Sequence, residues 1–286
     1  MAIKSWKSQT ISNSFMFRLV MERPEICKQL LERILEIKIN HIVYLDAEKS
    51  FEARLDSKGI RLDIYVEDED KTIYNVEMQA NDKDKEHLGK RTRYYQSLTD
   101  QYALKKGALY RDLRQTFIIF ICTFDPFGRN YSKYTFSNLC NEDTTVRLND
   151  NTQKIFLNTA GDRHRVSKDL ANFLDYVNDG KAKDEFTLAI NSMVNELRND
   201  TESEARYMTY EQTIMEAERN GEEKGIAKGL AEGLVQGKAE GLVQGKAEGK
   251  VEALKQLMKN MNISVKEAMK LLGIPMSDLA KYSSLL

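Results

Sequence analysis

The alternation of apolar and polar residues in two neighbouring segments, residues 59–67 and 72–80, constrains the fold of this chain most strongly. Successive side chains of a β-strand point to opposite faces, so Leu62, Ile64 and Val66 are expected to share the buried face of the first strand. Polar residues join the two segments, and this pattern predicts an antiparallel hairpin. We therefore expect the apolar sides of both strands to form part of a core.

The register of this hairpin decides whether two carboxylates meet. If the turn is centred on Asp70, Asp63 pairs with Glu77 and Arg61 pairs with Gln79. Directly paired residues have Cβ atoms roughly 4.5–5.5 Å apart, close enough for two carboxylates to share one ligand. A slip by one residue would turn one of these side chains to the opposite face and remove the pair.

A close pair of carboxylates is unfavourable unless a cation lies between them, and Mg²⁺ prefers oxygen ligands of this kind. The expected pair therefore indicates a metal site that cleaves phosphodiester bonds. The alternative is an exposed hairpin face that is acidic without a function, because Asp and Glu are mostly found on protein surfaces. On the spacing of the two carboxylates alone, we favour the exposed acidic face.

Further motifs on both sides of the hairpin occur in the order found in one known family. They lie at residues 13–17, 61–66, 74–79, 91–96, 117–122, 124–128 and 156–159. Together they resemble the PD-(D/E)xK nuclease family transposases, also called Rpn-type recombination-promoting nucleases, over roughly residues 10–180. Several separated motifs in the same order are more specific than one pair of acidic residues.

This resemblance implies an α/β fold with a restriction-endonuclease-like core, in which helices flank a mixed β-sheet, followed by a helical C-terminal extension. It also implies a Mg²⁺-dependent DNA endonuclease, with Mn²⁺ as a substitute ion, in recombination, mobile-element or defence biology. It identifies Asp63, Glu77 and Gln79 as catalytic residues. The two carboxylates, with the backbone carbonyl of Met78, would hold a metal that polarises the scissile phosphate and lowers the pKa of a bound water.

Two positions depart from the family pattern. Gln79 stands where the superfamily usually has lysine, and an amide can orient a water but carries no positive charge. Ser14 stands where the opening motif has an acidic residue, and Glu22 or Glu25 on the following helix are the candidates to replace it. These departures leave a second function open, that of a catalytically inactive nucleic-acid-binding or oligomerising protein that retains the nuclease fold.

The apolar runs and the cysteine pattern exclude several other classes. The longest apolar run, residues 117–122, is too short to span a bilayer and is typical of a buried central strand. The first residues lack the apolar stretch of a signal peptide, so we expect a cytoplasmic protein without a membrane partner. Cys27, Cys122 and Cys140 are widely spaced and the three histidines are scattered, which indicates neither a zinc site nor a disulfide framework.

A net charge of −1 means that contact with DNA, the expected partner, depends on a local basic patch. Residues 83–114 carry nine basic and four acidic side chains. Apolar residues recur in this segment at near-helical spacing, at Leu88, Tyr95, Leu98 and Tyr102. The pattern predicts an amphipathic helix that packs on the sheet directly after the second strand of the hairpin.

Arg91 lies in the first turns of this expected helix. We expect its guanidinium near the carboxylates, where it either holds a DNA phosphate or forms a salt bridge with Asp63 or Glu77. Lys83 and Lys90 are additional candidates for phosphate binding.

The character of the chain changes after residue 200, where a glycine recurs at every fourth position from Gly221 to Gly249. In a helix this spacing winds a track of small residues around the axis, and each glycine costs about 1 kcal/mol relative to alanine. An isolated helix of this kind is unstable. Either two chains pack along residues 221–250 and form a homo-oligomer, which we favour, or the segment is a charged, mobile linker.

These patterns divide the chain into three parts. We expect residues 1–200 to form the nuclease-like domain, residues 201–250 to form the repeat, and residues 251–286 to form a small helical tail. Ser264 and Glu267 make a capping-box pattern at the start of a helix in that tail. A DNA-reading helix-turn-helix and a helical-bundle cap both fit the tail, and we favour the cap because the tail has few basic residues.

Overall fold

The computed structural model describes residues 5–51, 59–83 and 85–286. The chain divides into two compact units, Met1–Glu211 and Gln212–Leu286, which we describe separately. The helix α6, Thr201–Met261, contributes its first residues to the first unit and its remaining residues to the second.

The first unit is built on a six-stranded mixed sheet with the strand order β1-β4-β5-β6-β8-β7. Its strands are β1 (Ile42–Ala47), β4 (Ile64–Asp68), β5 (Ile73–Gln79), β6 (Thr116–Cys122), β7 (Lys133–Phe136) and β8 (Thr152–Asn158). The strands β5, β6 and β8 are parallel, and the other pairings are antiparallel. Two short strands, β2 (Ser50–Phe51) and β3 (Ile60–Arg61), pair separately. The mixed sheet confirms the expected α/β core.

The pairing of β4 with β5 has the register that the sequence predicts. Ile64 lies opposite Val76, and Glu67 lies opposite Ile73, which centres the turn on Asp70. The first segment of the hairpin is interrupted, however, because Leu62 lies between β3 and β4 in neither strand.

This interruption corrects one expectation about the core. Ile64 and Val66 pack on one side of the sheet, but Leu62 packs in the hydrophobic cluster on the other side. The period-2 rule holds only along a continuous strand, and the chain turns before Ile64. The expectation that all three residues share one face is therefore wrong for Leu62.

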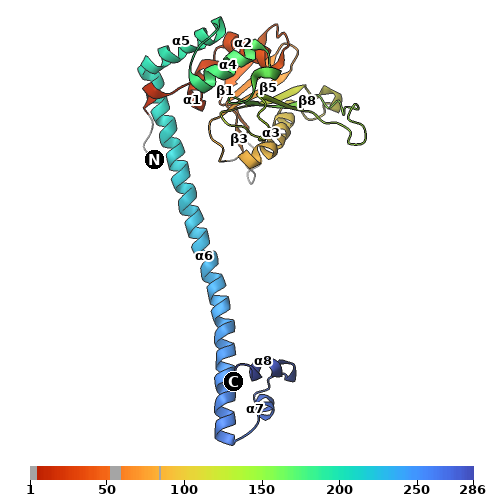
Figure 1. The fold of residues 1–286 in the computed structure, drawn as a ribbon, viewed down its shortest axis with the longest axis vertical. Helices are drawn as coiled ribbons and strands as arrows, with labels where there is room; N and C mark the ends of the chain where they lie inside the picture. Colours follow the sequence, from red (N-terminus) through yellow and green to blue (C-terminus); the bar gives the residue numbers. More distant parts are fainter. Residues whose placement is uncertain (1–4, 52–58, 84) are drawn as a thin grey trace. The chain divides into compact units, whose positions relative to one another are not determined.

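Helices cover both faces of the sheet, as Figure 1 shows. On one face lie α1 (Ser14–Met21), α2 (Pro24–Leu35), α4 (Lys168–Asp179) and α5 (Glu185–Asn199), and on the other lies α3 (Leu88–Ala103). Short 3₁₀ helices lie at Trp6–Ser8, Lys85–His87, Tyr110–Asp112, Arg163–Arg165 and Met276–Asp278. Every residue of β6 is buried, which confirms the buried central strand.

The expected amphipathic helix is α3. Leu88, Tyr95 and Leu98 face the sheet and are buried, as the helical spacing predicts. Tyr102 is 54% exposed instead, because it lies near the end of the helix, where its ring meets Phe51 with the ring centroids 5.0 Å apart.

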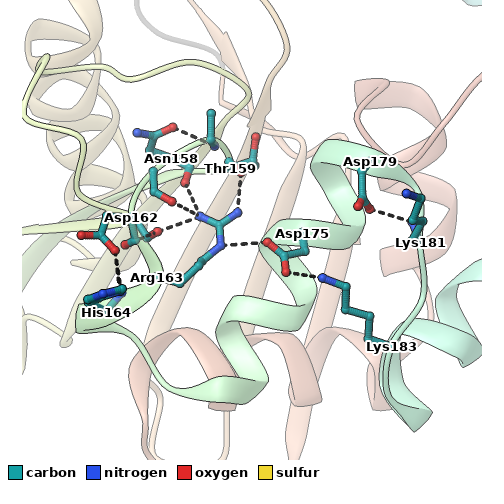
Figure 2. Close-up of polar contacts among 12 residues, drawn as sticks. Asn158, Thr159, Asp162, Arg163, His164, Asp175, Asp179, Lys181 and Lys183 are labelled. Atoms are coloured by element: carbon teal, nitrogen blue, oxygen red, sulfur yellow. Dashed lines mark hydrogen bonds and ion pairs between the residues drawn. The ribbon is translucent and has the colours of Figure 1, made fainter.

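The loop after β8 is fastened to its surroundings by one arginine, as Figure 2 shows. Nε of Arg163 donates to Asp175 on α4 at 3.0 Å, and Nη1 donates to the hydroxyl of Ser132 before β7 at 2.7 Å. Gly161 in the same loop leaves no room for a side chain, because a Cβ there would lie 2.6 Å from the carbonyl oxygen of Tyr131. These contacts hold the loop against both α4 and the edge of the sheet.

The second unit contains the remainder of α6 with α7 (Val265–Leu271) and α8 (Leu279–Ser283). Its small core consists of Leu254, Ala268, Met269, Ile274 and Tyr282. Ser264 and Glu267 form the expected capping box at the start of α7.

The glycine repeat of the second unit is helical, and its glycines meet no other part of the described chain. A Cβ built at any glycine from Gly221 to Gly249 would have no heavy atom within 4 Å, apart from the helix's own nearby backbone and its chain neighbours. Across the described residues, every helix is too short or too polar to cross a membrane.

Candidate active site

Asp63, which directly precedes β4, is in contact with Glu77 near the end of β5. The backbone N–H of Asp63 donates to Oε1 of Glu77 at 3.0 Å, and the backbone N–H of Met78 donates to Oδ2 of Asp63 at 3.0 Å. The Glu77 side chain is buried, whereas Asp63 is partly exposed. The structure therefore brings together the two carboxylates that the sequence pairs.

The direction of each side chain follows from its place in β5. Asn75, Glu77 and Gln79 alternate with buried apolar residues and point towards α3, where the Asn75 amide donates to the hydroxyl of Thr99 at 3.1 Å. The backbone N–H of Met78 points to the edge of β5 that faces Asp63. Because the N–H and C=O of one strand residue lie at the same edge, the Met78 carbonyl also faces that edge.

Arg91 reaches this site from α3. Its Nη1 donates to Oε1 of Gln79 at 2.7 Å, and its Nη2 lies 3.5 Å from Oε2 of Glu77 and donates to the hydroxyl of Tyr95 at 3.0 Å. Arg91 is thus placed near the carboxylates as expected, in a salt bridge with Glu77. Its side chain keeps 28% of its surface exposed, so a ligand in solution can reach it.

Burial dominates the electrostatics of the carboxylates. It raises the pKa of the Asp63 carboxyl to about 6, against the lowering effects of the Met78 N–H and of three nearby arginines. Burial, followed by the negative charge of Asp63, raises the pKa of Glu77 well above its usual value. A divalent cation between the two groups would favour their ionised forms and compete with protons for them.

The donor set fits a hard cation such as Mg²⁺, because two carboxylates and the Met78 carbonyl all offer oxygen. In the part of the chain that the structure describes, no group of three or more His, Cys, Asp or Glu side chains could hold a metal ion. An ion at this site would therefore complete its shell with water and substrate oxygens, which Mg²⁺ favours.

The other expected site residues are exposed to solvent. Lys83 precedes α3 and Lys90 lies within it, and both side chains are exposed to solvent. Glu22 and Glu25, the candidates to replace the acidic residue missing at Ser14, are both exposed. Glu22 caps the end of α1 and lies 3.5 Å from Arg206, and Glu25 is exposed in the first turn of α2.

Two residues near the site are not identified by the sequence reasoning. Arg18 on α1 is 2% exposed and forms an ion pair with the carboxylate of Glu48. The backbone N–H of Glu48 donates to the carbonyl of Asp63 at 3.1 Å. The only sequence signal for Arg18 is a basic residue inside the apolar run 15–21, and Glu48 has no such signal.

Comparison with known proteins identifies one family. The model of the PD-(D/E)XK nuclease family transposases matches residues 12–224, a span that contains both carboxylates, Gln79 and Arg91. No curated protein and no solved structure gives a significant match. The family match covers well over half of the sequence and agrees with the mixed sheet and its flanking helices. The chain belongs to the PD-(D/E)XK nuclease family transposases.

Proposed function

We propose that this protein is a Mg²⁺-dependent DNA endonuclease that hydrolyses phosphodiester bonds in recombination, mobile-element or defence biology. The contact between Asp63 and Glu77 carries the proposal, because it gathers two acidic groups beside a carbonyl and a partly exposed arginine. The family supports a nuclease-type function, and the choice of ion, substrate and biological context is our inference.

In this proposal Asp63, Glu77 and the backbone carbonyl of Met78 hold Mg²⁺, for which Mn²⁺ can substitute. The bound ion supplies Lewis-acid chemistry at the scissile phosphate and lowers the pKa of a water. Gln79 orients the attacking water or a phosphate oxygen through its amide. Because Nη1 of Arg91 lies 2.7 Å from Oε1 of Gln79, the guanidinium provides the positive charge that glutamine lacks.

Contact with DNA involves Arg91 first. Its planar guanidinium can donate two hydrogen bonds to one phosphate, which a lysine ammonium does not do in the same geometry. Lys83 and Lys90 add exposed positive charge before and within α3, and we infer that they bind phosphates of neighbouring nucleotides.

A plasmid-nicking assay tests the activity. Supercoiled plasmid with Mg²⁺ should be nicked or linearised by the wild-type protein and left intact by Asp63→Ala. The matched control is Asp70→Ala, which removes an exposed carboxylate from the turn of the same hairpin. Cleavage that persists in Asp63→Ala, with Asp70→Ala equally active, would contradict the proposed role of Asp63.

The second candidate function is a catalytically inactive nucleic-acid-binding or oligomerising protein. The observation that favours it is the salt bridge between Arg91 and Glu77, because a cationic partner already compensates one of the two carboxylates. This alternative predicts DNA binding in a gel-shift assay, without cleavage in Mg²⁺, Mn²⁺ or any other divalent ion.

We also propose that the repeat of residues 221–250 joins two chains into a homo-oligomer. Large aliphatic side chains stand exposed beside its glycines, namely Ile226, Leu230, Leu234 and Leu242. Close packing along the glycines would bury these side chains and offset the low helix propensity of glycine. Deletion of residues 221–250 should lower the mass measured by light scattering to that of a monomer, and an unchanged mass would remove the proposal.

The proposed arrangement remains a nuclease-like domain over residues 1–200, the repeat over residues 201–250 and a helical tail over residues 251–286. A cytoplasmic location remains our prediction, and a fusion to a fluorescent protein would test it by microscopy.

A further inference from the structure

The position of Asp63 is not set by an ordinary strand ladder. Asp63 lies in the break between β3 and β4, and its backbone N–H donates to the Glu77 side chain rather than to a neighbouring strand. Its carbonyl accepts the backbone N–H of Glu48 at 3.1 Å. Glu48 is therefore one of the residues that align Asp63 with Glu77.

Glu48 is held in a conformation that its residue type disfavours. Its φ is +79°, in the left-handed region where a side chain causes strain and where glycine is the least costly residue. In the described structure the Glu48 side chain is held by an ion pair between its carboxylate and Arg18.

Arg18 is itself an unusual group. Its side chain is 3% exposed, and its guanidinium carbon lies 5.1 Å from the Phe15 ring centroid and 4.5 Å from that of Tyr210. Its Nε and Nη2 are buried and have no hydrogen-bond partner among the described residues. A buried charge with unpaired donors costs stability, so packing alone does not account for an arginine here.

We propose that Arg18 and Glu48 form a latch that positions Asp63 opposite Glu77. Arg18 fixes the Glu48 side chain, the strained Glu48 backbone fixes the Asp63 carbonyl, and the Asp63 carboxylate is thereby held against the Met78 N–H. Both latch residues act through Asp63 and are positioning residues. The inference deepens the proposed function, on which its consequence for metal binding rests.

Three variants and one control test the latch in the full-length protein. Arg18→Met keeps much of the side-chain length and removes the charge, Glu48→Gln keeps the length without the charge, and Glu48→Gly relieves the backbone strain while removing the carboxylate. The control is Glu36→Gly, the same substitution at an exposed residue with a φ of 58° at the end of α2. This control relieves backbone strain at a position that has no contact with Arg18 in the described structure.

The first readout is hydrogen–deuterium exchange of the Asp63 and Met78 amides, which are bonded to the two carboxylates. This readout requires neither metal nor activity. Each latch variant should speed exchange at these amides at least tenfold and leave β6 unchanged, whereas Glu36→Gly should match the wild type. Exchange that stays at the wild-type rate in Arg18→Met and Glu48→Gln overturns the latch.

The second readout is the affinity for Mn²⁺ by titration calorimetry. Loss of a residue that orients a metal ligand commonly costs roughly 10–100-fold in affinity, and we expect that loss in each latch variant. Wild-type affinity in variants with faster exchange overturns the functional part of the inference. If the wild-type protein neither binds Mn²⁺ nor cuts DNA, the proposed function fails, and the exchange rates still decide whether the latch exists.

Discussion

Nη1 of Arg91 donates a hydrogen bond to Oε1 of Gln79 at 2.7 Å, so a guanidinium from α3 stands beside the residue that replaces the superfamily's lysine. The same guanidinium lies 3.5 Å from Glu77. The positive charge beside Gln79 therefore comes from a helix and not from β5. In the proposed function, Gln79 and Arg91 together take the role that a lysine has elsewhere in the superfamily.

Arg91→Ala should lower cleavage by at least about 100-fold, the usual scale for loss of a charge that stabilises a transition state. Gln79→Lys added to Arg91→Ala should restore about tenfold or more, because the lysine would return the charge to β5. Rates of plasmid cleavage for Arg91→Ala, Gln79→Lys and the double variant measure whether the lysine can replace the arginine. A double variant no faster than Arg91→Ala would show that Arg91 has a different role.

The raised pKa of Asp63, at about 6, predicts how stability depends on pH in the absence of divalent ions. The carboxyl group binds its proton more tightly in the folded protein than in the unfolded chain. Its protonation therefore adds fully to the free energy of unfolding below about pH 4, and this addition is lost as the pH rises through about 6. Asp63→Asn should therefore be more stable than the wild type at pH 8 by about 1–3 kcal/mol. Urea unfolding at pH 4 and pH 8 measures the difference, which should shrink at the lower pH.

Mg²⁺ should reverse this pH effect in the wild-type protein. The ion binds the ionised carboxylates and competes with protons, so the thermal unfolding midpoint should rise with Mg²⁺ more at pH 8 than at pH 5. Asp63→Asn and Glu77→Gln should lose the response. Equal shifts at both pH values in all three proteins would indicate binding elsewhere.

The first turns of α6 are predicted to stabilise the nuclease-like unit. Tyr207 is 2% exposed, its ring centroid lies 5.0 Å from that of Trp6, and its hydroxyl accepts a hydrogen bond from Gln9 at 2.9 Å. Tyr207→Ala should cost about 3–5 kcal/mol in the free energy of unfolding, as for other large aromatic residues in cores. Tyr207→Phe, which keeps the ring and loses the hydrogen bond, should cost about 1 kcal/mol. Similar costs for the two variants would contradict the packing argument.

Gly161→Ala should also destabilise this unit, for a different reason. The new methyl group would lie 2.6 Å from the Tyr131 carbonyl oxygen. Because the clash is with backbone atoms, it can be relieved only if the loop that Arg163 holds moves. Denaturant unfolding should show a loss of about 1–3 kcal/mol, the usual range for overpacking. The control is Gly89→Ala, where a methyl group would meet no heavy atom of the described chain within 4 Å beyond its own helix backbone and chain neighbours.

The sequence predicts the carboxylate pair because local rules set the register. Alternation assigns Glu77 to one side of β5, and the turn centred on Asp70 aligns the two strands. The same rules place Leu62 on the wrong side, because no residue signals the break between β3 and β4. The opposing sides of the sheet are both buried, so the apolar pattern does not reveal which one Leu62 joins.

Local sequence patterns do not predict the side-chain contacts between different helices and strands. Helical spacing brings Arg91 close to the carboxylates, but its bond to Gln79 depends on how α3 is rotated on the sheet. Arg18 and Glu48 meet across 30 positions of sequence through the packing of α1 beside β1. Glu22 and Glu25 are near in sequence to the missing acid, yet the end of α1 directs Glu22 to Arg206.

The most direct test of the account is to locate a bound ion. A crystal of the wild-type protein grown with Mn²⁺ should show an anomalous peak between the carboxylates of Asp63 and Glu77, within bonding distance of the Met78 carbonyl. The peak should be absent from Asp63→Ala crystals grown in the same way. A wild-type crystal with no peak at the two carboxylates, or with Arg91 still paired to Glu77 and the ion bound elsewhere, would contradict the central claim.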